Sequence, residues 1–310
     1  MKRLLLLLNM GGPNNLSEVE VFLKNMFNDP CILGIKNKFL RKFIAFMITR
    51  SRLKEATHNY EQIGGKSPIC EITQRLCGKI SSLSDEFDAV DFAMNYTPPF
   101  AKEVLKKYEN FDEIIVLPLY PHHSITTVVS SLNDFNKAFE ELNLKAKVKI
   151  IEPFYKDELY NQVIVNSIKN MVKDLKTEEI TLIFSAHSLP QKIIDNGDVY
   201  EKHTLEHVEI LSALINKEMK FKEIRVAYQS RLGPVKWLEP ALGDELAKLE
   251  NKKALIYPIS FCIDNSESVF ELAKEYKDVA DELKFEYYDV VACPNDSEEF
   301  AKFLIQIALK

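Results

Sequence analysis

One histidine stands out as a side chain that could carry chemistry. His187 follows the largely apolar run Leu182–Ala186, at the point where a buried strand would end. A neutral imidazole can accept a proton or bind a metal ion near pH 7. Loops at strand ends often carry function, but a structural histidine bonded to a loop carbonyl group is an equally good explanation of this position.

A short row of carboxylates forms a second candidate. Glu267 and Glu271 are four residues apart in a predicted helix, so they share one helix face, and Asp264 stands at the helix entrance. Such a row could carry protons or bind a hard cation. Spacing alone favours a solvated acidic face with a capping aspartate. The preceding Tyr257–Phe261 segment favours function, because it places this helix start after a strand, as for His187.

Three further features are weaker. Gly11–Pro13 and Gly64–Pro68 could expose backbone amides to an anion, but neither has a nucleotide-binding spacing, and tight turns explain them better. Lys38–Lys54 is basic and apolar together, which suits a membrane surface or a pocket mouth, although composition favours an ordinary amphipathic helix. Trp237, the only tryptophan, could face a flat ligand or belong to the core.

Short apolar runs alternate with longer amphipathic segments along the whole chain. The predicted strands are Arg3–Leu8, Asp88–Met94, Glu113–Leu117, Lys147–Ile151, Ile180–Phe184, Glu223–Ala227, Lys253–Tyr257 and Phe285–Val291. The predicted helices between and after them include Leu16–Phe27, Ile69–Leu83, Asn161–Leu175, Thr204–Met219, Glu267–Leu283 and Ser297–Leu309. This alternation predicts an α/β fold with parallel sheets covered on both faces.

The spacing of the strands predicts two Rossmann-like domains, each with a four-stranded parallel sheet flanked by helices. Residues 1–153 would form the first domain and residues 154–310 the second, and the last helix could pack on either half. In such folds ligand sites gather at the carboxyl ends of strands. Five polar or aromatic loops follow predicted strands, so we expect them to converge on one site.

Composition excludes several classes of protein. The chain has 310 residues and a net charge of −6, which does not favour nucleic acid. Five unclustered cysteines argue for a reducing compartment and against disulfides or a zinc site. The leucine run after Lys2-Arg3 is too short for a signal peptide, and no stretch approaches the roughly 20 apolar residues of a membrane span. We therefore expect a cytoplasmic protein.

Taken together, the motifs resemble those of ferrochelatases along essentially the whole chain. They occur in the order found in that family: Leu7–Pro13, Ile63–Pro68, Leu117–Ser124, Ser185–Pro190, Tyr228–Pro240 and Pro258–Ser268. The resemblance implies an enzyme that inserts Fe²⁺ into protoporphyrin IX and releases two protons, the last step of haem biosynthesis. Iron and porphyrin would both be substrates, with no tightly bound cofactor.

The resemblance also implies roles for individual residues. His187 and Glu267 would be the catalytic pair and would meet the metal ion, and which of them takes the protons stays open. Asp264 and Glu271 would extend a path for protons or metal. Porphyrin contacts would come from Met10, Arg52, Tyr60, Ser67, Tyr120, Ser124 and Trp237. Lys38–Lys54 would correspond to the lip of the porphyrin pocket, with peripheral contact to the inner membrane surface.

Some positions depart from the family pattern. Asn265 stands where the family often has a histidine, so one titratable group is absent. Asn95 replaces an arginine found in some members, so propionate anchoring would differ. Ile125 stands where some members have a cluster-binding cysteine, and the family's C-terminal cysteine group has no counterpart, so we expect no iron–sulfur cluster. Met10 stands where coproporphyrin-using members typically have tyrosine, which favours protoporphyrin IX.

Three alternatives remain at this point. A cobalt chelatase for a corrinoid precursor shares the expected architecture, and His122 and His123 are compatible with it. A non-catalytic porphyrin carrier would need the pocket but not both His187 and Glu267. A periplasmic binding protein also has two α/β lobes, and the lack of a signal peptide counts against it.

Overall fold

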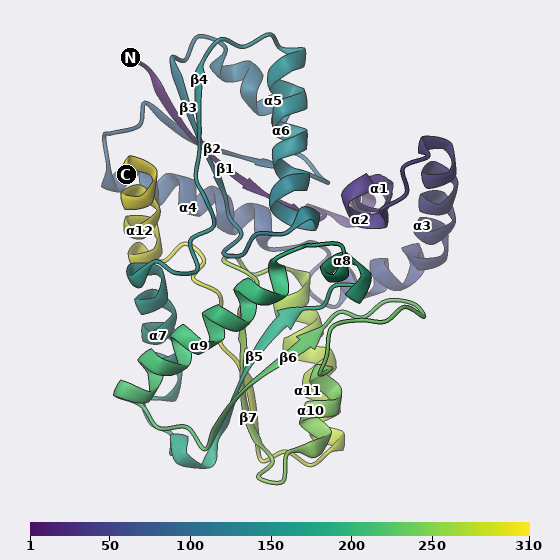
Figure 1. The fold of residues 1–310 in the computed structure, drawn as a ribbon, viewed down its shortest axis with the longest axis vertical. Coiled ribbons are helices and arrows are strands. Elements are labelled where there is room, and N and C mark those ends of the chain that lie inside the picture. The colour runs from purple at the N-terminus through teal and green to yellow at the C-terminus, as the bar shows by residue number, and fades with distance from the viewer. The chain divides into compact units, whose positions relative to one another are not determined.

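The computed structural model describes residues 1–310 and divides the chain into two compact units. Unit 1 comprises Met1–Tyr120, Ser124–Pro153 and Asp296–Lys310, and unit 2 comprises Pro121–His123 and Phe154–Asn295. Each unit contains a four-stranded sheet in which all neighbouring strands are parallel (Figure 1). The predicted fold class is therefore confirmed.

The sheet of unit 1 has the strand order β2-β1-β3-β4. Its strands are β1 (Arg3–Asn9), β2 (Ala89–Met94), β3 (Glu113–Pro118) and β4 (Lys147–Ile150). Leu4–Leu7 of β1 are fully buried, because this inner strand is covered on both faces of the sheet. The N-terminal leucine run is thus a core strand, as its length predicted.

The helices of unit 1 include a final one that comes from the end of the chain. They are α1 (Val19–Asn28), α2 (Pro30–Leu33), α3 (Lys38–Glu61), α4 (Ile69–Leu83), α5 (Ala101–Leu105), α6 (Ser130–Glu141) and α12 (Glu298–Leu309). A π-helical turn, Ile125–Val129, leads into α6. Helix α12 packs against α4.

The sheet of unit 2 has the strand order β6-β5-β7-β8. Its strands are β5 (Thr181–His187), β6 (Glu223–Gln229), β7 (Lys253–Pro258) and β8 (Tyr287–Val290). The crossovers that follow β5 and β6 run in opposite directions, which leaves a switch point where β5 meets β7. Ligand sites of open parallel sheets lie at the carboxyl ends of strands at such points.

The helices of unit 2 are α7 (Glu158–Val172), α8 (Gln191–Asp195), α9 (Tyr200–Glu218), α10 (Leu242–Lys248) and α11 (Tyr276–Glu282). Two of them, α7 and α9, lie close to predicted ranges, whereas the short helices α8 and α10 were not among the predicted helices. The predicted helix over Glu267–Leu283 instead begins as a π-helix, Glu267–Glu275, and continues as α11. None of the helices in the structure has the length and apolar character required to span a bilayer.

Candidate functional site

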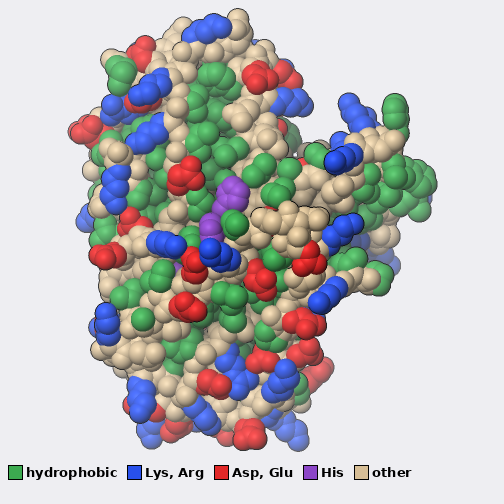
Figure 2. All heavy atoms as spheres, in the orientation of Figure 1, with side chains coloured by type: hydrophobic (Ala, Val, Ile, Leu, Met, Phe, Trp, Pro, Cys, Tyr) green, Lys and Arg blue, Asp and Glu red, His purple; other side chains and the backbone are tan.

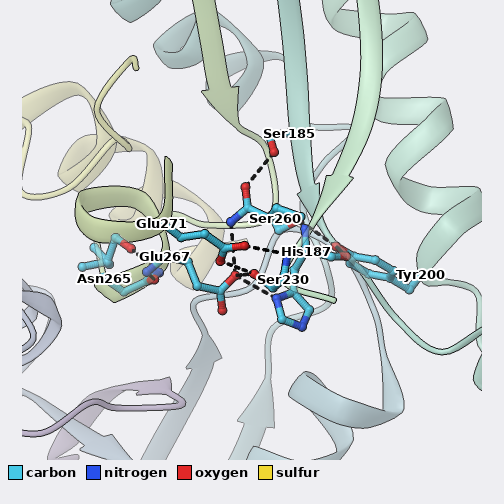
Figure 3. Close-up of polar contacts among 10 residues, drawn as sticks. Ser185, His187, Tyr200, Ser230, Ser260, Asn265, Glu267 and Glu271 are labelled. Carbon is cyan, nitrogen blue, oxygen red and sulfur yellow. Dashed lines mark hydrogen bonds and ion pairs between the residues drawn. The ribbon is translucent and has the colours of Figure 1, made fainter. Parts of the chain in front are cut away.

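A cluster of polar side chains lies at the carboxyl ends of β5, β6 and β7, within unit 2 (Figure 3). His187 is the last residue of β5, and its strand partner in β6 is Gln229. Glu267 is the first residue of the π-helix after β7. The parallel register therefore brings these three side chains together at the switch point of the sheet.

The central contact joins His187 to Glu267. The Nδ1 atom of His187 lies 2.8 Å from Oε2 of Glu267. The His187 side chain is 36% exposed and that of Glu267 is 18% exposed, so the imidazole can reach a ligand while the carboxylate lies deeper. A carboxylate accepts hydrogen bonds, so Nδ1 carries the hydrogen and Nε2 of the neutral ring has a free lone pair.

The backbone of His187 is fixed from two sides. Its amide donates to Oγ of Ser260 at 3.0 Å, and its carbonyl oxygen accepts from the Tyr200 hydroxyl at 2.9 Å. Tyr200 and Ser260 also bond to each other at 2.6 Å. These contacts connect the end of β5 to Tyr200 at the start of α9 and to Ser260 just after β7. The backbone that carries the His187 ring is therefore held by regular elements.

Gln229 gives Glu267 a second hydrogen-bond partner. Ser185 donates to Oε1 of Gln229 at 2.6 Å, which orients the amide so that its Nε2 faces Glu267 at 3.2 Å. Asn265 accepts from the amide of Glu267 at 2.8 Å and so fixes the start of the π-helix. Asn265, which departs from the family pattern, therefore stabilises the first turn of the π-helix.

Charges and burial shift the pKa values of the three titratable groups in this cluster. Burial works against ionisation of both His187 and Glu267, but their mutual attraction prevails: the pKa of His187 is raised and that of Glu267 is lowered. Burial and the neighbouring Glu267 charge raise the pKa of Glu271 to about 7. The site thus contains a half-buried carboxylate, Glu267, and a second carboxyl group, Glu271, that can exchange a proton near neutral pH.

Asp264 is tied to a different part of unit 2. Its Oδ2 accepts from Nδ2 of Asn295 at 2.6 Å, and its amide donates to Oδ1 of the same residue at 2.8 Å. Its Oδ1 accepts from the amide of Cys293 at 3.3 Å. The structure therefore brings Glu271 into the cluster around Glu267, whereas the hydrogen bonds of Asp264 go to the loop after β8.

Six of the predicted porphyrin-binding residues belong to unit 1. Met10 and Tyr60 pack in one hydrophobic cluster, and the Ser67 side chain lies against Gly12 so closely that a Cβ atom there would be 2.6 Å from it. The Tyr120 hydroxyl pairs with Ser131, the Ser124 hydroxyl caps the π-helical turn, and Arg52 pairs loosely with Glu55 on α3. Met10, Tyr60 and Ser67 thus gather near the carboxyl end of β1, and all six residues except Met10 and Arg52 are buried.

Trp237 is the one predicted porphyrin contact in unit 2. It is half-buried, its indole Nε1 lies 3.4 Å from the carbonyl oxygen of Gly233, and it forms a β-bridge with Pro190 in the loop after His187. No group of three or more His, Cys, Asp or Glu side chains is arranged to hold a resident metal ion.

Several functional contacts had no distinct sequence signal. Gln229, Ser230 and Ser260 were visible only as members of polar loops after strands and of family motifs, with no individual role. Tyr200 is separated from His187 by the helix α8, and nothing in its surroundings in the sequence predicts the contact.

Comparisons with known proteins identify the family. A family model described as Ferrochelatase matches residues 2–310. A protein named Ferrochelatase from Campylobacter concisus is 67% identical over 307 residues, covering 99% of this chain and 97% of its own. The chain belongs to the ferrochelatase family. A ferrochelatase from Nitratiruptor is 51% identical over 306 residues, covering 98% of both chains.

Solved structures of similar fold are chelatases. SirB from Bacillus subtilis, determined with Fe³⁺, has a TM-score of 0.55 at 12% identity and covers 99% of this chain and 96% of its own. CbiX, described as the terminal enzyme of sirohaem biosynthesis in denitrifying bacteria, has a TM-score of 0.54 at 11% identity, with coverages of 99% and 97%. At these identities the likeness shows the fold, which this ferrochelatase-family chain shares with them.

A pair of buried histidines lies next to the cluster. His122 Nε2 is 2.9 Å from His207 Nδ1, and His207 Nε2 is 2.7 Å from Oδ1 of Asn161. The His122 ring also contacts that of Tyr200. Burial lowers the pKa of His207 to about 3, and burial together with His207 lowers that of His122. His122 therefore belongs to a neutral core network.

This network predicts acid sensitivity of folding. In the unfolded chain His207 takes up a proton below pH 6.5, whereas in the folded chain it stays neutral down to about pH 3, so its contribution to stability is lost as the pH falls. Between pH 6.5 and 5.0, we expect the wild type to lose about 2 kcal/mol more unfolding free energy than His207→Gln. Urea unfolding at both pH values measures this, and equal losses would contradict the neutral assignment.

Proposed function

We propose that this protein inserts ferrous iron into protoporphyrin IX to form protohaem, with release of two protons. The observation that carries the proposal is the His187–Glu267 pair at the switch point of unit 2, in a chain of the ferrochelatase family. Met10 in the first glycine loop supports protoporphyrin as the substrate, because coproporphyrin-using relatives typically have tyrosine there.

The chemistry requires two protons to leave the pyrrole nitrogens as Fe²⁺ enters the ring. With Nδ1 bonded to Glu267, His187 presents Nε2 as a proton acceptor, and the imidazolium that forms is stabilised by the half-buried carboxylate. Glu267 and Glu271 offer oxygen atoms that suit both proton transfer and a divalent cation. We therefore assign His187 and Glu267 as the catalytic and metal-contacting pair, with Glu271 on the path that protons or metal follow.

The remaining site residues stay predictions. Met10, Arg52, Tyr60, Ser67, Tyr120, Ser124 and Trp237 are proposed as porphyrin contacts, and the grouping of Met10 with Tyr60 and Ser67 supports this. Asp264 is proposed as a further member of the path for protons or metal, although its carboxylate accepts a hydrogen bond from Asn295. That the enzyme works without an iron–sulfur cluster likewise stays a prediction.

The first test is an anaerobic insertion assay. Purified protein is mixed with protoporphyrin IX and ferrous iron, with coproporphyrin III in parallel, and loss of the free-base absorption spectrum is followed. We expect turnover with protoporphyrin and a loss of about 100-fold or more in His187→Ala, because the proton acceptor is removed while the porphyrin contacts remain. His58→Ala, which removes an exposed histidine of α3, is the matched control.

Two outcomes would contradict the proposal. Porphyrin binding without iron insertion by the wild type would leave a porphyrin carrier instead of an enzyme. Full turnover by His187→Ala would remove the assigned proton acceptor.

We also propose that α3 contacts the surface of the inner membrane from the cytoplasmic side. Its exposed apolar side chains are Phe39, Leu40, Phe43, Phe46 and Met47. Their spacing places them on one face of the helix, and Lys38, Arg41, Lys42, Arg50 and Lys54 add positive charge within the same segment. Figure 2 shows this green surface over α3, with blue basic side chains beside it.

Vesicle binding tests the membrane contact. We expect the wild type to co-sediment with vesicles containing phosphatidylglycerol, and a Phe43→Glu/Phe46→Glu variant to bind at least 10-fold more weakly, since it loses apolar contact and gains repulsion. Leu159→Glu, which alters an exposed leucine of α7, is the control and should bind as the wild type does. Equal binding by all three proteins would contradict the assignment to α3.

A further inference from the structure

Ser230, the first residue after β6, has an uncommon backbone conformation. Its φ is +64°, in the left-handed region that residues other than glycine rarely adopt. In this conformation its amide donates to Oε1 of Glu271 at 2.7 Å while its hydroxyl contacts Oε2 of the same carboxyl group. The backbone turn thus aims both polar groups of one serine at one side of the π-helix.

The same hydroxyl also reaches Glu267. Oγ of Ser230 lies 2.9 Å from Oε2 of Glu267, the oxygen that already accepts from His187 and Gln229 (Figure 3). Ser230 therefore stands between the two carboxyl groups of the π-helix. It is the one side chain in the cluster that is hydrogen-bonded to both.

Counting hydrogens shows what this arrangement requires. A hydroxyl group has one hydrogen to donate. If Ser230 donates it to Glu267, its contact with Glu271 needs a hydrogen from Glu271; if it donates to Glu271, the contact with Glu267 needs a hydrogen from Glu267. Both contacts are ordinary two-centre hydrogen bonds only when the two carboxyl groups hold at least one proton between them.

We propose that Ser230 is a positioning residue for iron insertion, whose hydroxyl joins Glu267 and Glu271 into one unit that shares a proton and holds Glu267 against His187. The inference rests on the proposed function, because it assigns a role within the same site.

The arrangement gives protons a defined route. Once Glu271 has released its proton to solvent water, a proton on Glu267 can pass to Oγ of Ser230 while the original hydroxyl hydrogen passes to Glu271. One O–H bond breaks and one forms at Ser230, so the serine is unchanged and the proton has moved from Glu267 to Glu271. Without the hydroxyl, this step has no connected donor and acceptor.

The test compares Ser230→Ala and Ser230→Gly with the wild type. Both variants lose the hydroxyl and keep the amide, and glycine also removes the cost of the positive φ. Ser188→Ala is the matched control, because that buried hydroxyl has no hydrogen-bond partner. The measurements are kcat, KM for protoporphyrin, the pH profile of kcat and the melting temperature.

We expect both Ser230 variants to lose about 10-fold or more in kcat, with KM changed less than about twofold, since Ser230 acts on proton transfer and not on porphyrin binding. The acid limb of the profile should move to higher pH by about one unit, because a hydrogen bond that stabilised the ionised carboxylate is gone. Ser188→Ala should behave as the wild type does.

Three results would overturn the inference. The first is a wild-type kcat, with the acid limb of the pH profile at its wild-type position, in either Ser230 variant. Alternatively, kcat could fall together with the melting temperature while the acid limb stays in place, which would indicate a purely structural role. If the wild type itself inserts no iron, the proposed function fails, but the inference about Ser230 can still be tested. The test is then a ¹³C NMR titration of the glutamate carboxyl groups in the porphyrin-free protein. The third contradicting result is a titration of Glu267 and Glu271 that is the same in Ser230→Ala as in the wild type.

Discussion

The site depends on one half-buried carboxylate, that of Glu267, and on the hydrogen bonds that keep it ionised. Oε2 of Glu267 has three partners, His187, Gln229 and Ser230. An isolated carboxylate in this position would take up a proton, because burial disfavours its charge. The three contacts reverse that preference, and the same contacts orient the imidazole whose second nitrogen faces outward. The charge of Glu267, the orientation of the His187 ring and the basicity of its Nε2 atom therefore all depend on these three hydrogen bonds.

The parallel sheet supplies these partners from separate parts of the chain. His187 ends β5, Gln229 and Ser230 lie at the end of β6, and Glu267 follows β7. Parallel strands end at one edge, so residues 37 to 80 positions apart in the sequence meet there. The buried leucines and isoleucines of β5 and β7 fix the register and so fix these distances. Side chains mounted on rigid strand ends are better positioned than side chains on long loops.

The fold followed from the sequence because its main elements have strong local patterns. The apolar runs of β1 and β5 are those of strands covered on both faces, and amphipathic segments separate them. His187 was a candidate from its place at a strand end, and family motifs singled it out together with Glu267. These are local properties, so a linear reading detects them.

The other features depend on contacts between distant segments. The link from Ser230 to two carboxyl groups requires a left-handed residue opposite a π-helix, and neither has a compositional signature. The sequence predicts Asp264 as a helix cap or a member of an acidic row, yet its side chain is hydrogen-bonded to Asn295, 31 residues away. Helix α12 belongs to unit 1 although a strand of unit 2 precedes it, because its buried face packs against α4. Only tertiary packing decides such cases.

The hydrogen bond between His187 and Glu267 is the central claim, and ¹⁵N NMR of the histidine side chains tests it most directly. In porphyrin-free protein above the raised pKa of His187, we expect the His187 ring to be neutral with its hydrogen on Nδ1, and Glu267→Leu, which removes the hydrogen-bond acceptor, to abolish that preference. A His187 ring that carries its hydrogen on Nε2, or one that the Glu267→Leu change leaves unaltered, would contradict the account.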